Sequence, residues 1–250
     1  GTRCGRQTMS LSRREFLAAG AATAATALAP GLRLVELAQA RAPEEAAGKL
    51  QRWGLLIDVT QCADGCNACV TACHEENGVT SHNRPATDAQ WIRKVTIKDR
   101  QTGYVQSLPL MCQHCEEPPC VDVCPTGASF KRIDGIVLVD KHICIGCRYC
   151  MMACPYKARS FIHEDTKDQK PHAPRGKGTV ESCTLCVHKV DRGDGTTACA
   201  DACKKEGRGA ILFGDLNDAS SELRKRLASR PSTQLRPDLN LNTGVRYTGI

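Results

Sequence analysis

Short hydrophobic runs, rather than long periodic segments, are the main structural signal along this chain. Residues 53–60 (Trp-Gly-Leu-Leu-Ile-Asp-Val-Thr) form an apolar, β-branched run that predicts a buried strand. Segments 91–97 and 103–110 also have strand character and flank a turn, so they predict a hairpin. Within 129–139, an Asp-Gly pair predicts a second hairpin, because Asp-Gly favours tight two-residue turns.

Helical and loop signals are confined to a few places. A helix is predicted over 220–229, where Ser220 or Ser221 can cap its start and Pro231 ends it. Residues 232–250 lack helical periodicity and predict an extended tail, of a kind that often frays. The polar, turn-rich segments 74–88 and 163–181 predict exposed loops.

The amino-terminal segment has the pattern of an export signal. Arg13-Arg14 precedes an Ala-rich apolar run at 17–30, which is typical of bacterial twin-arginine export, and Ala38-Gln39-Ala40 fits a cleavage site. We therefore expect residues 1–40 to be a signal peptide with its native start at Met9, and the processed protein to be periplasmic. The run is shorter than the ~20 residues that span a bilayer. The alternative is an amphipathic helix with chance arginines.

Composition argues against an aromatic core and against a nucleic-acid partner. Aromatic residues make up 4% of the chain, whereas there are 17 cysteines, so metal-bound cysteines are expected to form much of the core. The net charge is +7, but five arginines and two acids in the first forty residues carry +3 of it. Metal-bound thiols are deprotonated and lower the charge further.

Sixteen cysteines, all except Cys4, fall into four quartets between residues 62 and 203. The spacing C-x2-C-x2-C-x3-C-P is that of bacterial ferredoxins, in which the fourth cysteine ligates the neighbouring cluster. Three cysteines at short steps can reach three corners of one cubane, while the fourth sits on the next helical turn. The quartets are Cys62, Cys66, Cys69 and Cys73; Cys112, Cys115, Cys120 and Cys124; Cys144, Cys147, Cys150 and Cys154; and Cys183, Cys186, Cys199 and Cys203.

These quartets predict four [4Fe-4S] clusters, with zinc as the main metallic alternative. Structural zinc sites use two cysteine pairs separated by a longer spacer, which only the last quartet resembles. One outer site could therefore hold zinc, or a [3Fe-4S] cluster. A c-type haem is disfavoured, because C-x-x-C-H is required and the gap from Cys69 to Cys73 is three residues.

The sequence offers no catalytic constellation beside the clusters. The seven histidines are scattered, and the chain has neither a Walker loop nor a G-x-G-x-x-G motif. Fully ligated clusters pass single electrons, so we predict an electron-transfer subunit and no catalytic residues of its own. His114 and His142 neighbour cluster cysteines and could tune potentials by donating to sulfur, or could face solvent.

Over about residues 53–215 the chain resembles the four-cluster ferredoxin subunits of the dimethyl sulfoxide reductase, polysulfide reductase and formate dehydrogenase type. The resemblance implies an α+β, loop-rich fold of tandem ferredoxin-like modules with a pseudo-twofold repeat and clusters in the core. We expect a domain over 41–219 and a separate tail at 220–250. Within the domain, the inner module is 111–159 and the outer motifs are 62–73 and 183–203. A hairpin insertion at 89–110 either faces a partner or packs over a cluster.

The resemblance also implies how the cysteines pair into clusters. In this family the fourth cysteine of each motif is exchanged with a partner motif. Carried over, the four ligand sets are Cys62, Cys66, Cys69 and Cys203; Cys112, Cys115, Cys120 and Cys154; Cys144, Cys147, Cys150 and Cys124; and Cys183, Cys186, Cys199 and Cys73.

Three segments narrow the resemblance within the family: the run 144–156, the segment 213–218, and Gly-Val-Arg-Tyr at 244–247. They are most similar to the periplasmic iron–sulfur subunit of the sulfite-reduction-associated Dsr membrane complex. That implies a polytopic quinone-interacting membrane partner, a multihaem cytochrome c and cytoplasmic heterodisulfide-reductase-like subunits. The alternatives are a molybdopterin tetrathionate or polysulfide reductase, a nitrite reductase, or a zinc-stabilised scaffold without redox activity.

Overall fold

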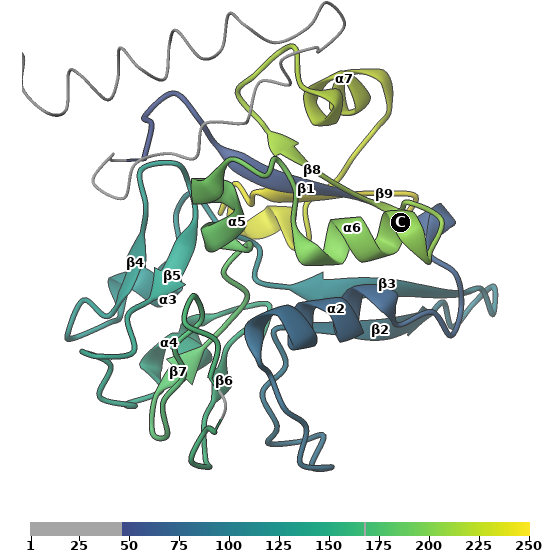
Figure 1. Ribbon diagram of the computed structural model, residues 1–250. Coiled ribbons are helices and arrows are strands. Elements are labelled where there is room, and N and C mark those ends of the chain that lie inside the picture. The colour runs from purple at the N-terminus through teal and green to yellow at the C-terminus, as the bar shows by residue number, and fades with distance from the viewer. Residues whose placement is uncertain (1–46, 168) are drawn as a thin grey trace, which may run out of the picture. The chain divides into compact units, whose positions relative to one another are not determined.

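The structure is a computed structural model that describes residues 47–167 and 169–250 (Figure 1). The predicted signal peptide, its native start and Cys4 lie outside these residues. The described part combines short helices with four small sheets, so the α+β class is confirmed. In this part of the chain no helix is long and apolar enough to cross a membrane.

A three-stranded sheet joins segments that are far apart in the sequence. Its central strand is β1 (Trp53–Asp58), which runs antiparallel to β8 (Ile211–Asp215) and parallel to β9 (Val245–Thr248). Gly54 allows this close approach, because a β-carbon there would overlap the carbonyl oxygen of Gly244. The predicted strand at 53–60 is confirmed, although it ends at Asp58 and continues as a 3-10 helix over Val59–Gln61.

The carboxyl-terminal tail is extended as predicted, and its end packs into the core, so the alternative of a frayed tail does not apply. After a 3-10 helix at Pro237–Leu239, strand β9 places Val245 and Tyr247 in the buried core. The Tyr247 hydroxyl donates to the carbonyl of Pro109 at 3.2 Å. The tail pairs with β1 through backbone hydrogen bonds, which hydrophobic periodicity cannot reveal.

Both predicted hairpins are present. Strands β2 (Ile92–Lys98) and β3 (Val105–Met111) pair antiparallel, as do β4 (Ser129–Lys131) and β5 (Val137–Val139). The base of the first hairpin is buried, and its tip, residues 97–105, is exposed. The base therefore packs on the core, while the tip is free to meet a partner.

The prediction of an exposed loop over 163–181 is wrong at the carboxyl-terminal end of this segment. Strand β7 (Val180–Glu181) pairs with β6 (Ser160–Phe161), and Glu181 is fully buried. Arg175 compensates this buried charge, with Nη2 2.7 Å from Oε1 of Glu181, and it donates Nη1–H to the carbonyl of Gly78 at 2.7 Å. A buried charge needs such a partner, and a polar sequence does not show one.

Six α-helices lie in the described part of the chain, and four of them carry cysteines. The predicted helix at 220–229 is confirmed, with the Ser221 hydroxyl accepting from the amide of Arg224 at 3.1 Å. Buried cysteines pack together with aliphatic and aromatic side chains in the main core. The helices are α2 (Ala68–Asn77), α3 (Pro119–Asp122), α4 (Tyr149–Ala153), α5 (Val187–Arg192), α6 (Ala198–Lys205) and α7 (Glu222–Ser229).

Candidate iron–sulfur centres

All four cysteine motifs place their third cysteine on a short helix in the same way, and the fourth lies on the helix in α2 and α6 and just past its end in α3 and α4. The third cysteine is the second residue of the helix, and the fourth follows four residues later, one turn further along. The third cysteines are Cys69 on α2, Cys120 on α3, Cys150 on α4 and Cys199 on α6. The sequence reasoning predicted the extra turn but not this common position.

A second shared feature is a left-handed backbone just before the second cysteine of each motif. The residues with positive φ there are Gly65, His114, Gly146 and Leu185, at 73°, 43°, 69° and 54°. Two of them carry side chains, for which this conformation is strained. The left-handed residue turns the chain between the first and second cysteines, and in three of the motifs these two cysteines line the same cavity. At His114 and Leu185 the residue type does not reveal this conformation, so sequence reasoning missed it.

The structure brings cysteines from different motifs together around three cavities. In each cavity, three cysteines come from one motif and the fourth from another, because α3 packs on α4 and α2 packs on α6. We name each group by its first cysteine. The Cys112 group is Cys112, Cys115, Cys120 and Cys154; the Cys144 group is Cys144, Cys147, Cys150 and Cys124; the Cys183 group is Cys183, Cys186, Cys199 and Cys73.

The Cys62 group consists of Cys62, Cys66, Cys69 and Cys203, and electrostatics shows that these thiols are neighbours. Burial, together with the charges of nearby Cys199, Cys203, Cys62 and Cys66, raises the pKa of Cys69 to about 12. Burial also raises the pKa of Cys62, with Lys94 acting in the opposite direction. Three of the cysteine sets that the family resemblance assigns to one cluster thus line one cavity each, and the Cys62 set interacts electrostatically; the assignment of cysteines to clusters stays a prediction.

The buried thiols Cys112 and Cys186 need a bound cation to ionise. Burial raises the pKa of Cys112 and of Cys186 to about 12, so these thiols would stay protonated at neutral pH on their own. None of the sixteen cysteines in the described residues forms a disulfide. Iron supplies the positive charge that makes buried thiolates stable, so the donor set fits iron–sulfur clusters.

Helix packing and the interactions between cysteines of different groups indicate that the four groups lie in series. The charge on Cys112 acts on Cys183, the charge on Cys120 acts on Cys150, and the charge on Cys199 acts on Cys69. The order is therefore the Cys144 group, the Cys112 group, the Cys183 group and the Cys62 group. The two middle groups are buried, whereas both end groups contain partly exposed cysteines: Cys124, Cys144 and Cys147 at one end, and Cys62 and Cys66 at the other.

Backbone amides and one buried arginine donate hydrogen bonds to the sulfurs. The amide of Ser129 donates to Sγ of Cys124 at 3.3 Å, and that of Leu185 donates to Sγ of Cys183 at 3.4 Å. Arg159 Nη2 donates to Sγ of Cys120 at 3.1 Å and to the Ser129 hydroxyl at 2.8 Å. Arg159 is 5% exposed and was missed by sequence reasoning, since nothing in its local pattern marks it as buried.

The two histidines that were considered for sulfur tuning differ in the structure, and for His114 that role stays a prediction, because its buried Nε2 has no hydrogen-bond partner among the described residues. His114 is buried, and its Nδ1 accepts from the amide of Val137 at 3.1 Å. Burial lowers the pKa of His114 to about 3, with a contribution from Arg159, so the ring is neutral. His142 is exposed. The donors to the cysteine sulfurs described above are backbone amides and Arg159.

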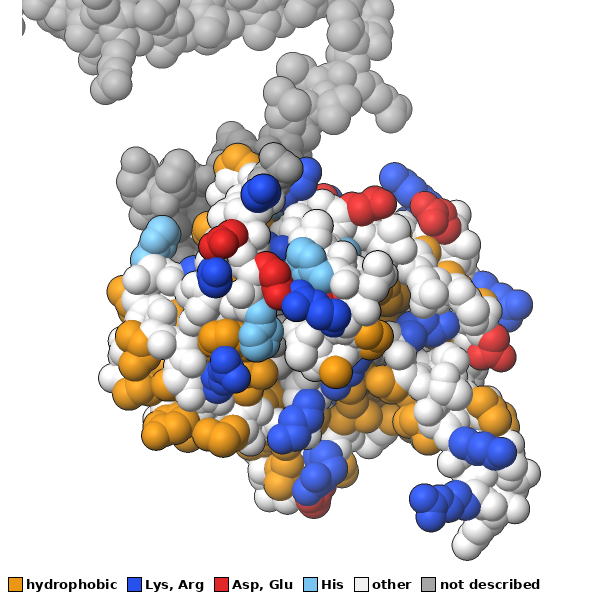
Figure 2. Space-filling model, turned by 90° about the horizontal axis from the view of Figure 1, so that it is seen from below, with side chains coloured by type: hydrophobic (Ala, Val, Ile, Leu, Met, Phe, Trp, Pro, Cys, Tyr) orange, Lys and Arg blue, Asp and Glu red, His pale blue; other side chains and the backbone are white. Residues whose placement is uncertain are grey.

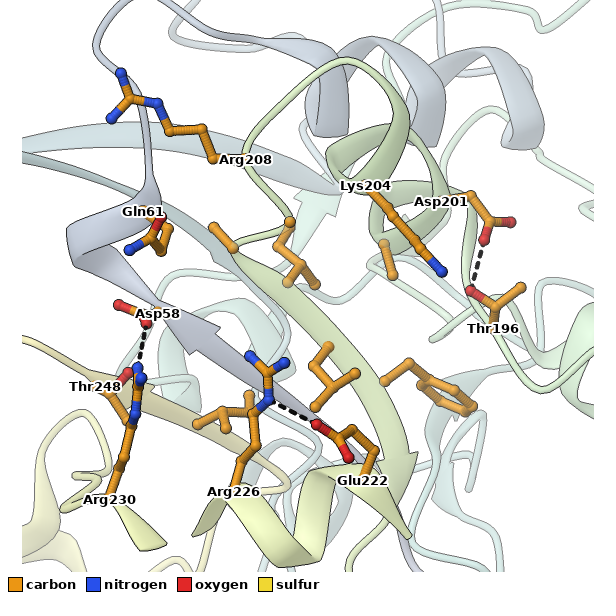
Figure 3. Close-up of a pocket in the computed structure, with 17 residues that line it drawn as sticks. Asp58, Gln61, Thr196, Asp201, Lys204, Arg208, Glu222, Arg226, Arg230 and Thr248 are labelled. Carbon is orange, nitrogen blue, oxygen red and sulfur yellow. Dashed lines mark hydrogen bonds and ion pairs between the residues drawn. The ribbon is translucent and has the colours of Figure 1, made fainter.

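An open groove of about 650 Å³ lies between the three-stranded sheet, α6 and α7, and two ion pairs lie within it. Figure 3 shows Arg226 bonded to Glu222 and Arg230 bonded to Asp58, at 2.9 and 3.1 Å. Thr196 donates to Asp201 at 2.8 Å. These are surface ion pairs and hydrogen bonds, not a nucleophile with its base.

Fold and cysteine groups define a ferredoxin-type electron carrier with several clusters. Family models described as "4Fe-4S dicluster domain" match residues 103–215 and 61–128, and the chain belongs to this family. This confirms the predicted kind of cofactor, the [4Fe-4S] cluster.

Three relatives place the chain among components of oxidoreductases. It is 41% identical to the Hdr-like menaquinol oxidoreductase iron-sulfur subunit 1 of Archaeoglobus fulgidus, over 96% of this chain and 98% of the relative. It is 36% identical to a tetrathionate reductase subunit of Salmonella typhimurium, over 97% and 90%. It is 38% identical to a sulfite dehydrogenase subunit of Allochromatium vinosum, over 77% and 81%. The prediction of an electron-transfer subunit, rather than a catalytic one, is confirmed.

Proposed function

We propose that this chain is a periplasmic subunit that passes electrons through four [4Fe-4S] clusters between a quinone-interacting membrane protein and a multihaem cytochrome c. The complex would serve sulfite or sulfate respiration, as in the Dsr membrane complex. The observation that carries the proposal is the series of four cysteine groups with two exposed ends. The twin-arginine pattern supports the periplasmic location, and the relative named as a menaquinol oxidoreductase subunit supports a quinone partner.

Each cysteine group would hold one cluster in this proposal. The four groups would supply the sixteen thiolates, and the two halves of the chain would be related by a pseudo-twofold repeat. The shared helix positions and the shared left-handed residues support both points. Bound clusters supply the one-electron chemistry, while the protein sets their order, burial and hydrogen bonds.

A second candidate function is electron transfer to a molybdopterin enzyme. The relative from tetrathionate reductase covers nearly all of this chain and favours it. Isolation of the native complex separates the two. A multihaem cytochrome with a polytopic quinone-site protein supports the first proposal, and a molybdopterin subunit in their place would replace it with the second.

The exchange of fourth cysteines makes a prediction about iron content. Cys203→Ser and Cys62→Ser are each expected to remove one cluster, about a quarter of roughly sixteen irons, because each cubane holds four. The double variant should lose no more than either single one, since both residues would ligate the same cluster. Lys204→Ser, on the next residue of α6, is the control.

Iron analysis and absorbance near 400 nm measure how many clusters each variant has lost. A double variant that has lost about half of its iron would show that Cys62 and Cys203 belong to different clusters. That result would contradict the proposed ligand sets while leaving the presence of [4Fe-4S] clusters intact.

The exposed end at the Cys144 group is apolar, which favours a permanently bound partner. Figure 2 shows hydrophobic side chains gathered on the flank that carries α3, α4 and the β4–β5 hairpin. Ile145 and Met152 are both 66% exposed, and Tyr149 is more than half exposed. The opposite end has polar neighbours such as Gln61, Asp64 and Thr71. Permanent interfaces are more hydrophobic than transient ones, so we place the membrane partner at the apolar end.

Met152→Glu should therefore release the membrane partner. Burying an unpaired carboxylate in the interface costs about 2 kcal/mol or more, which weakens binding more than tenfold. Thr71→Glu, at the polar end, should leave that binding unchanged. Copurification from detergent and iron content are the readouts. If Met152→Glu keeps the membrane protein but loses the cytochrome, the two ends have been assigned in the wrong order.

A further inference from the structure

Outside the cysteine groups, one glutamate and two histidines from three separate elements converge. Glu76 lies on the last turn of α2, His188 lies on the first turn of α5, and His172 lies in the loop before β7. One possible ligand atom from each lies within 4.8 Å of the other two. Neither the cysteine motifs nor the proposed electron path accounts for this arrangement.

The geometry of the three side chains is that of two imidazoles facing one carboxylate. His188 Nε2 lies 2.7 Å from Oε1 of Glu76, and His172 Nε2 lies 3.8 Å from the same atom. The two imidazole rings stack, with centroids 3.9 Å apart and planes inclined by 30°. His172 Nε2 also lies 2.9 Å from the backbone carbonyl oxygen of Glu76, in a hydrogen bond that a bound ion would replace.

The three residues are held in place by the surrounding structure. Helix α2 also carries Cys73, and α5 begins directly after Cys186, so both helices are fixed by the Cys183 group. The loop of His172 is tied to the end of α2 by Arg175, through its bond to Gly78. The side chain of His188 is only 11% exposed, whereas Glu76 and His172 are about one-third exposed.

A solvent path leads to the site. A groove of about 440 Å³ is lined by Glu76 and His172 together with Glu75, Lys170 and Lys189. The nearby charge of Lys189 is offset by Asp194 and Asp201, at 3.7 and 3.4 Å. A cation can therefore enter from water and keep one or more water ligands.

We propose that Glu76, His172 and His188 bind Zn²⁺ or a similar late first-row divalent cation. Histidine nitrogens and one carboxylate oxygen are a preferred ligand set for zinc, with water in the remaining position. The ion would replace the proton between His188 and Glu76 and would draw His172 toward them. It would clamp residues 169–179 of the loop before β7 onto the two helices beside the Cys183 group.

The test uses the cluster-loaded, full-length protein after treatment with a chelator. Equilibrium dialysis against ZnCl₂, followed by metal analysis, should give about one zinc per chain with the iron content unchanged. His172→Ala should weaken zinc binding at least tenfold, because only two of the three protein ligands would remain to hold the ion. His163→Ala, in the same loop but outside the triad, is the matched control and should bind zinc normally.

X-ray absorption at the zinc edge identifies the ligands independently of the variants. The proposal requires nitrogen and oxygen neighbours at about 2.0–2.1 Å and no sulfur shell at about 2.3 Å. A sulfur shell would mean that zinc has entered a cysteine group, which overturns the site. Absence of zinc from the wild-type protein, or full binding by His172→Ala, overturns it as well.

Discussion

Arg159→Gln is expected to lower the reduction potential of the cluster in the Cys112 group. Arg159 places a buried positive charge against Sγ of Cys120, and the charges of Cys112 and Cys150 also act on it. An added electron makes a cluster more negative, so a nearby positive charge favours the reduced state. At about 8 Å and an effective dielectric constant of about 20, one charge contributes about 2 kcal/mol, or on the order of 90 mV for one electron.

Two comparisons show whether charge or hydrogen bonding causes the effect. Arg159→Lys keeps the charge but loses the forked donor, so a smaller shift is expected. Arg93→Gln removes a nearby arginine that donates to the carbonyls of Tyr156 and Lys157 instead of to sulfur, and it should shift the potential little. Redox titration followed by electron paramagnetic resonance measures all three. Equal potentials in wild type and Arg159→Gln, at full iron content, would refute the role of this charge.

Arg159 also illustrates where sequence reasoning stops. Cysteine spacing predicts the four quartets, because spacing along a helix or a tight turn dictates which sulfurs can reach one centre, and the family resemblance adds which quartets exchange their fourth cysteine. An arginine that becomes buried beside a sulfur has no such local signature. Its position depends on how β4 and the segment after Cys154 pack, which is a property of the tertiary structure.

The strands show the same difference between what a local sequence pattern reveals and what depends on the tertiary structure. Residues 53–58 are predictable as a strand because they are a continuous apolar run. Strand β9 was missed, since Val245, Arg246 and Tyr247 form too short a run to stand out, and the pairing with β1 spans almost the whole domain. His172 and His188 likewise look scattered along the sequence. Only the fold brings the loop before β7 against α2 and α5.

Gly146→Ala is expected to remove the cluster of the Cys144 group, whereas Gly65→Ala should keep its own cluster. The two glycines occupy equivalent places in their motifs and have similar φ values of 69° and 73°. The left-handed conformation costs an alanine about 1–2 kcal/mol at either place. At Gly146, however, the new methyl group would overlap the carbonyl oxygen of Gly178 and lie 3.1 Å from Cε2 of Phe161, while at Gly65 it meets nothing within 4 Å.

The clash at Gly146 has no easy relief. The amide of Gly178 donates to the carbonyl of Ile162 at 2.8 Å, which anchors the turn against which the methyl group would press. The loop of Cys144 and Cys147 must therefore move, and these two sulfurs would leave the positions that a cubane requires. Iron content should fall by about a quarter in Gly146→Ala and stay constant in Gly65→Ala. Equal iron loss in both variants would show that backbone conformation alone, and not contact with Gly178, makes glycine necessary before the second cysteine.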